Sequence, residues 1–194
     1  MGAPRRWYRL DRAKPPWGDY GDILLAGMTG HQPRTREGLL QLERTGPFVP
    51  PITLAGPDDL LVTNAFRAEL ERSPLAGPGF RPVEKTRIVR LEWEQWDQSA
   101  DNPLEYPEGG EPEDYILNRP HDPELAAQIG PLWEVVLPGI GERAEADLVR
   151  DLPATLHIYA SQRAKDWLQQ HAGDWLSFAD SPDSPGKTNY RLTI

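Results

Sequence analysis

Acidic side chains dominate one stretch of this chain. Between Leu91 and Asn118 there is no Lys, Arg or His, and nine carboxylates alternate with four aromatic residues. Carboxylates this close repel one another, so by themselves they contribute little to folding. A cationic partner would be steered toward them and would pair with them at the rim of an interface. The pattern predicts a partner-binding surface made of Glu92, Glu94, Trp96, Asp97, Glu105, Tyr106, Glu111, Glu113 and Asp114.

Two kinds of residue divide the work on this predicted surface. Trp96 and Tyr106 are the expected anchors, because Trp and Tyr dominate the energetics of protein interfaces. The expected steering charges are Glu94, Asp97, Glu105 and Glu111. A solvated loop with its tryptophans in the core remains an equal alternative. No Asp-x-Asp-x-Asp-Gly calcium loop is present, so no metal site is predicted.

Histidines offer two further candidate sites. His31 precedes Arg34 and Arg36 in a loop that could hold an anion, and His121 is followed directly by Asp122. Either group could serve a hydrolase or a transferase as an acid–base site. Each is more common as loop polarity, and Asp122 before a proline is typical of a helix N-cap.

Signatures of nucleophilic or phosphate chemistry are missing from the sequence. There is no cysteine, no Gly-x-Ser-x-Gly elbow and no Gly-x-x-x-x-Gly-Lys-Ser/Thr loop. The absence of cysteine excludes disulfides, thiolate nucleophiles and sulfur-ligated zinc. We therefore expect neither a cofactor nor an enzyme, with the histidine sites kept as the alternative.

The elements that must position these residues are short. Leu60–Thr63 reads as a buried strand, Asn64 as an N-cap, residues 65–72 as a helix and residues 81–93 as a strand. A similar unit closes the chain. It has a strand at 155–159, a helix at 162–171 capped by Ser161, a stop at Gly173 and a strand at 175–178.

Other segments give weaker signals. Strands are expected at 7–10, 22–26 and 134–137, and a short helix at 122–128. Residues 38–42 fit a strand and a helical turn equally well. Residues 180–193 read as a loop, with Tyr190, Leu192 and Ile194 as the residues that could pack it back onto the fold. Together the pattern predicts an α+β fold with a mixed sheet, short helices, two strand–helix–strand units in one core and long Pro/Gly-rich loops.

Length and charge bound the class of protein. The chain has 194 residues, a net charge of −9, 21 Pro and 17 Gly. This length fits a single domain over residues 1–194, with an acidic, loop-rich insertion at about 94–120. The negative charge argues against nucleic acid as a partner. No run is long and apolar enough for a signal peptide or a membrane span, so a cytoplasmic location is expected.

The order of motifs resembles that of immunity proteins from bacterial polymorphic-toxin systems, including swarming-inhibitor antitoxins with a double Cys-x-x-Cys-Gly motif. The resemblance lies in Gly46-Pro-Phe48, Leu60-Leu-Val62, the strand through Val89 to Trp93, and residues 156–178. This chain lacks both Cys-x-x-Cys pairs, so any zinc site of those relatives is absent. The resemblance implies a non-enzymatic inhibitor that binds and occludes one cognate toxin.

A basic toxin is the partner that this combination predicts. Nuclease toxins carry basic grooves because they bind phosphates, and an acidic protein can occupy the same groove. A structural or regulatory interaction module is the remaining alternative. The sequence identifies neither the toxin nor the oligomeric state.

Overall fold

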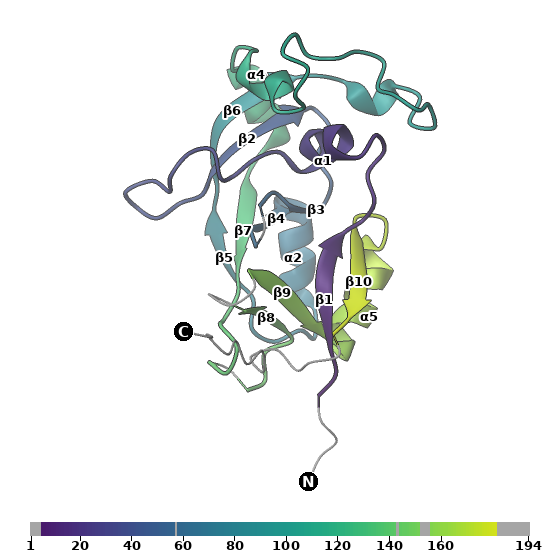
Figure 1. The fold of residues 1–194 in the computed structure, drawn as a ribbon. Helices are drawn as coiled ribbons and strands as arrows, with labels where there is room; N and C mark the ends of the chain where they lie inside the picture. Colours follow the sequence, from purple (N-terminus) through teal and green to yellow (C-terminus); the bar gives the residue numbers. More distant parts are fainter. Residues whose placement is uncertain (1–4, 57, 143, 152–155, 182–194) are drawn as a thin grey trace, which may run out of the picture. The chain divides into compact units, whose positions relative to one another are not determined.

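The computed structural model describes residues 5–56, 58–142, 144–151 and 156–181, which form an α+β fold (Figure 1). Their contacts divide the chain into two compact units, one from residues 1–13, 73–79 and 136–194 and one from residues 14–72 and 80–135. The predicted strand–helix–strand segments fall in different units, so the expectation of one core over the whole chain stays a prediction. None of the described helices is long and apolar enough to cross a membrane.

The first unit is built on a four-stranded antiparallel sheet in the order β10-β1-β9-β8. Its strands are β1 (Trp7–Arg12), β8 (Leu148–Asp151), β9 (His157–Ser161) and β10 (Leu176–Asp180). Helix α5 (Gln162–Ala172) packs on β1, β9 and β10. The predictions of strands near 7–10, 155–159 and 175–178 and of the helix are confirmed, although residues 152–155 and 182–194 lie outside the described part.

Helix α5 follows from local chemistry. The Ser161 hydroxyl accepts a hydrogen bond from the Ala164 amide at 3.2 Å, as an N-cap should. Ala164, Leu168 and Ala172 are buried at intervals of four residues, so one face of the helix covers the sheet. The helix ends at Gly173, as predicted.

A buried carboxylate in the first unit, Asp147, connects four segments that are far apart in the sequence. Asp147 is fully buried, and its carboxylate lies 2.6 Å from Arg5 Nη2 and 2.6 Å from the Ser161 hydroxyl. The Arg163 guanidinium and the Ala76 amide also donate to it. Burial alone raises the pKa of Asp147, but these hydrogen bonds outweigh it and leave the pKa below its usual value.

The second unit contains two sheets. β2 (Gln41–Gly46) and β6 (Glu84–Arg90) pair in parallel. The other sheet has the order β3-β4-β7-β5, with β3 (Ile52–Leu54), β4 (Leu60–Thr63), β7 (Leu132–Val136) and β5 (Gly79–Pro82). The predicted strands at 60–63 and 134–137 are confirmed.

Helices of the second unit are α1 (Asp19–Ala26), α2 (Asn64–Arg72), η1 (Trp93–Gln95, a 3₁₀ turn), α3 (Asp114–Leu117) and α4 (Pro123–Ile129). Helix α4 begins where predicted, because Asp122 accepts a hydrogen bond from the Leu125 amide at 2.8 Å. Helix α2 is also confirmed, but its cap is Thr63, whose hydroxyl accepts from the Phe66 amide. Asn64 accepts from the Trp133 indole instead.

Two strand predictions in this unit are wrong. Residues 22–26 belong to helix α1, which buries Leu24 against aromatic side chains. The four-residue apolar run at 23–26 cannot by itself distinguish a helix from a strand. The predicted strand over 81–93 is broken at Val83, where β5 ends and β6 begins, and it stops at Arg90. Trp93 lies in η1 and is buried among aromatic side chains.

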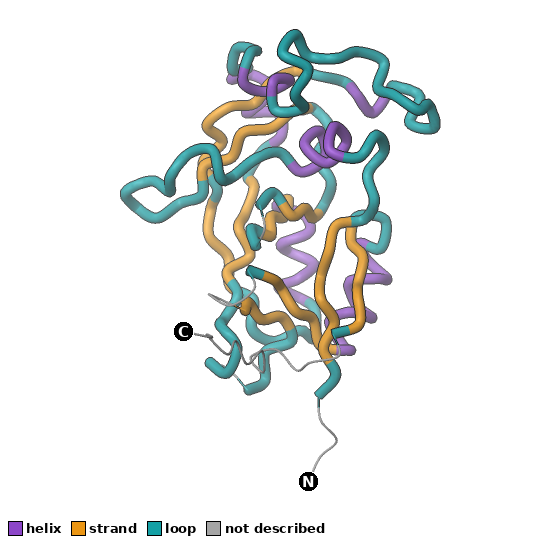
Figure 2. The backbone as a smooth tube through the Cα atoms, in the orientation of Figure 1, coloured by secondary structure: helices purple, strands orange, loops and turns teal. Residues whose placement is uncertain are grey.

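Two long connections leave this framework (Figure 2). The basic connection, residues 27–40, joins α1 to β2 and carries His31, Arg34 and Arg36. The acidic connection, residues 91–118, runs from β6 toward α4 and contains only the short helical segments η1 and α3. These two connections carry most of the candidate residues.

Candidate partner-binding surface

The carboxylates of the acidic connection lie mainly at the surface. Six are exposed: Glu92, Asp97, Asp101, Glu105, Glu108 and Glu111. Three are half-buried: Glu94, Glu113 and Asp114. None belongs to the core, because burying an unpaired charge costs several kcal/mol. One carboxylate oxygen, Oε2 of Glu94, is nevertheless buried without a hydrogen-bond partner in the described part of the chain.

These carboxylates find few cations within the protein. Glu105 is the only one of the nine that forms an ion pair with a described residue, and its Oε1 lies 3.0 Å from Arg119 Nη2. Asp97 instead accepts hydrogen bonds from the hydroxyl and amide of Ser99, which lower the pKa of Asp97 below its usual value. The connection therefore presents negative charge that internal arginines do not neutralise.

An aromatic base supports this charged surface. Trp93 is 2% exposed and Tyr115 is fully buried, and both pack with Leu24 and Leu91. The rings of Phe48 and Trp93 meet edge to face with centroids 5.6 Å apart. Such pairs add about 0.5–1.5 kcal/mol beyond the apolar area that they bury. The acids thus sit over a small core of their own.

The two predicted anchors have different surroundings. Trp96 is half-buried, with its ring centroid 5.9 Å from that of Trp17 and 6.3 Å from that of Tyr115. Tyr106 is 52% exposed and touches Tyr20 edge to face. Trp96 therefore contributes to the aromatic base, whereas Tyr106 offers much of its ring to solvent.

Hydrogen bonds from aromatic side chains hold the backbone of the connection. Trp17 Nε1 donates to the Ala100 carbonyl at 3.0 Å, and the hydroxyls of Tyr20 and Tyr115 donate to the carbonyls of Gly110 and Glu105. Burial, and then the charge of Glu105, raise the pKa of Tyr115 to about 12, so its hydroxyl remains a donor at neutral pH. The loop is fixed by groups that keep no charge of their own.

Leu104 was not predicted as a site residue. It is 78% exposed, and two residues later in the chain Tyr106 is also exposed. A lone Leu between Pro and Glu gives no periodic signal, so the sequence could not distinguish it from an ordinary loop residue.

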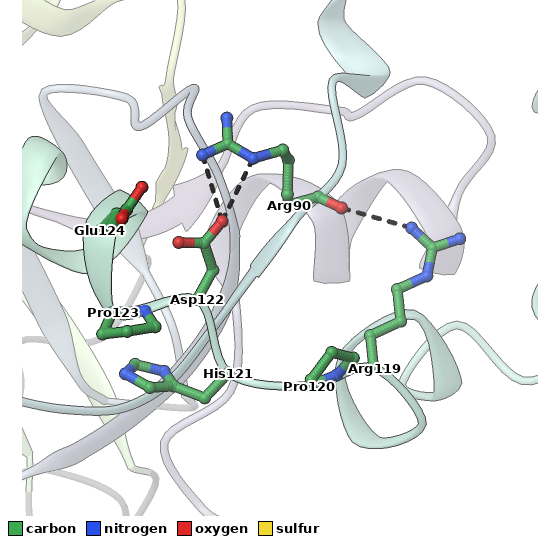
Figure 3. Close-up of a pocket in the computed structure, with 7 residues that line it drawn as sticks. All are labelled: Arg90, Arg119, Pro120, His121, Asp122, Pro123 and Glu124. Atoms are coloured by element: carbon green, nitrogen blue, oxygen red, sulfur yellow. Dashed lines mark hydrogen bonds and ion pairs between the residues drawn. The ribbon is translucent and has the colours of Figure 1, made fainter.

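His121 and Asp122 do not act as a pair. The Ile88 amide donates to His121 Nδ1 at 2.9 Å, while the Asp122 carboxylate caps α4 and lies 3.1 Å from Arg90 Nη2. Arg90 Nε also donates to that carboxylate. Both residues line a pocket of about 430 Å³ next to Arg90 and Arg119 (Figure 3).

The basic connection ties up its charges against buried carboxylates. His31 Nδ1 lies 2.7 Å from Glu43 Oε2, and Arg34 forms two hydrogen bonds of 2.8 and 2.9 Å with Glu134. Both carboxylates are 2% exposed. The predicted anion site of His31 with Arg34 is therefore not assembled, because both side chains, although exposed, already face buried carboxylates. Arg36 is exposed too and forms no ion pair with a described residue.

No three His, Asp or Glu side chains of the described segments lie close enough together to hold a metal ion. Comparison with family models, with curated proteins and with solved structures finds no match for this chain. What can be said about function therefore comes from the residues themselves.

Proposed function

We propose that this protein is an immunity-type inhibitor that binds a basic protein toxin through the acidic connection and blocks the toxin by occlusion. The proposal rests on one observation: exposed carboxylates lie over an ordered aromatic base, and only Glu105 among them has an ion-pair partner in the described chain. An ordered, uncompensated surface of this kind is costly for folding and useful for recognition.

Preorganisation strengthens the argument. Aromatic hydrogen bonds and ring contacts hold the connection in place before any partner arrives, so little conformational entropy would be lost on binding. The exposed side chains of Leu104 and Tyr106 would supply apolar contact beside the exposed carboxylates of Glu105 and Glu108. A cationic groove such as one that binds a phosphate backbone has the complementary charge.

A growth assay and a kinetic assay test the proposal with a candidate basic toxin sought among the genes next to this one, and the absence of any toxin gene there would count against the proposal. Coexpression of the inhibitor should restore growth to cells that make the toxin. Changing Glu92, Glu108 and Glu111 together to Lys should slow association roughly tenfold at low salt and flatten its dependence on salt. Surface binding kinetics at two salt concentrations measure both effects.

A matched variant separates local charge from total charge. Glu69, Glu84 and Asp174 are exposed carboxylates outside the acidic connection, and changing all three to Lys alters the net charge equally. This control should retain most of the association rate. Equal slowing in both variants, or no effect in either, would remove the acidic connection from the interface.

A further inference from the structure

The open pocket beside α4 has the volume of a small-molecule site. Its volume of about 430 Å³ falls in the range of ligand pockets, and the side chains of Arg90, Arg119 and His121 line it (Figure 3). All three residues belong to the second unit. The proposed toxin inhibition makes no use of this pocket.

His121 contributes a hydrogen-bond donor. Because the Ile88 amide donates to Nδ1 at 2.9 Å, Nδ1 has no proton, and the neutral ring carries its proton on Nε2. Ile88 is fully buried in β6, and the Asp122 amide donates to its carbonyl at 2.7 Å. These two hydrogen bonds with Ile88 fix both the backbone at Asp122 and the orientation of the His121 ring.

Both arginines keep donors for which the described part of the chain offers no acceptor. Arg90 directs Nε and Nη2 to Asp122, and no described residue accepts from its Nη1. Arg119 donates from Nη1 to the Arg90 carbonyl and from Nη2 to Glu105, and no described residue accepts from its Nε. Their side chains are 49% and 35% exposed, so these donors are accessible.

One of the two carboxylates that line the pocket, Asp122, is already occupied. Asp122 accepts from the Leu125 amide on Oδ1 and from Arg90 on Oδ2, which also lowers its pKa and keeps it ionised. The adjoining Pro120 and Pro123 have no amide hydrogen to offer. Glu124 is exposed and is the one lining carboxylate without such partners among the described residues. The polar groups of the pocket that are free to bind a ligand are therefore mainly the donors of His121, Arg90 and Arg119.

We propose that this pocket binds the oxyanion of a small acidic molecule, either a carboxylate or a phosphate monoester. Arg90 and Arg119 supply charge and planar forks that match such oxygens, and His121 Nε2 supplies a third donor. Glu124 weakens the site by repulsion, so affinity is modest and depends on that residue.

Backbone amide shifts measured by NMR test this site. Inorganic phosphate and acetate are titrated separately into the full chain, with sodium chloride keeping ionic strength constant. We expect saturable shifts around residues 119–124 with at least one anion. Saturation with phosphate alone identifies a phosphate ligand, saturation with acetate alone identifies a carboxylate ligand, and saturation with both leaves the oxyanion class as proposed.

Charge variants decide whether the response is specific. Arg119→Gln should bind about tenfold more weakly, the loss expected for a charge-assisted hydrogen bond. Glu124→Gln should bind several-fold more tightly, because it removes the repelling carboxylate. Arg36→Gln, on the exposed basic connection, is the matched control and should leave the affinity unchanged.

Two results would overturn the proposal. One is a linear, unsaturable response to both anions in the natural protein. The other is an anion affinity that falls in Glu124→Gln, since that would mean that Glu124 supports the bound molecule and does not repel an oxyanion. Amide spectra of each variant without ligand show whether its fold is intact, and Glu124→Gln tests the sign of the ligand charge even if Arg119→Gln is disturbed.

Discussion

The basic and the acidic connections of the second unit are held in opposite ways. In the basic connection, His31 and Arg34 are matched by the buried carboxylates of Glu43 and Glu134. In the acidic connection the charges point outward, and neutral aromatic groups hold the backbone. One loop uses its charges to stay in place, whereas the other keeps nearly all of its charges unpaired.

This difference separates structural charge from functional charge. An arginine next to a buried carboxylate cannot be given up to a ligand without leaving that carboxylate unpaired, which costs about 3–5 kcal/mol. An exposed carboxylate without a partner is available to any cation that approaches. Whether a charged loop can bind a partner therefore depends less on how many charges it has than on whether those charges are already paired within the protein.

The largest effect is expected where a buried carboxylate has the most partners, at Asp147 of the first unit. Asp147→Asn should lower the free energy of unfolding by about 3 kcal/mol at pH 7, because the buried carboxylate accepts from Arg5, Ala76, Ser161 and Arg163, whereas an Asn amide offers them a single neutral acceptor oxygen. The folded-state pKa of Asp147 is lowered, so its contribution is present above the unfolded pKa of about 4 and is lost as the pH falls below it. Denaturant unfolding from pH 7 to pH 3 measures this.

A pH profile gives the sharper form of this prediction. The natural protein should lose stability as the pH falls from about 5 to 3, and Asp147→Asn should show a shallower slope over that window. Asp166→Asn changes an exposed carboxylate on the same unit and should leave the slope unchanged. Parallel profiles for all three proteins would mean that Asp147 does not control acid stability.

The next effect tests the charge-based anchoring of the basic connection directly. Arg34→Met should cost about 2 kcal/mol, less than the loss of a fully buried pair, because the Arg34 side chain is 37% exposed and Arg81 Nη1 remains 3.8 Å from Glu134. Arg36→Met alters an exposed arginine two residues away and should change stability by less than about 0.5 kcal/mol. Thermal unfolding monitored by circular dichroism compares them, and equal losses would contradict the assignment of Arg34 to an internal role.

The elements that the sequence predicts correctly are those in which apolar residues are buried and polar residues are exposed. The caps at Ser161 and Asp122 and the helices that follow them are examples, because the cap residue and the apolar spacing agree. The sequence does not predict β2, because its pattern covers only residues 38–42 and fits a strand and a helical turn equally well. That strand buries Glu43, Arg44 and Thr45, and a polar run of this kind does not look like a buried strand.

The partners that explain this burial come from distant parts of the chain. Arg44 is 1% exposed and donates to the carbonyls of Thr45, Leu25 and Phe48, and burial lowers its pKa to about 10. Glu43 meets His31 across a loop that no local pattern places. For the candidate site, composition located the acidic surface, but it could not separate Trp96 in the aromatic base from exposed Leu104.

The smallest stability effects distinguish the base of the acidic connection from its surface. Trp96→Ala should lower the free energy of unfolding by about 2 kcal/mol, roughly half the cost of a fully buried tryptophan, because the ring contacts Trp17 and Tyr115 while half-buried. Leu104→Ala should change stability by less than about 0.5 kcal/mol, because Leu104 is 78% exposed. Binding should show the reverse order if the proposed interface is right: Leu104→Ala should speed dissociation from the toxin several-fold with little change in association. Denaturant unfolding ranks the two variants by their loss of stability, and surface binding kinetics ranks them by their dissociation rate. If Leu104→Ala leaves dissociation unchanged while Trp96→Ala retains full stability, the aromatic base and the contact surface have been assigned the wrong way round.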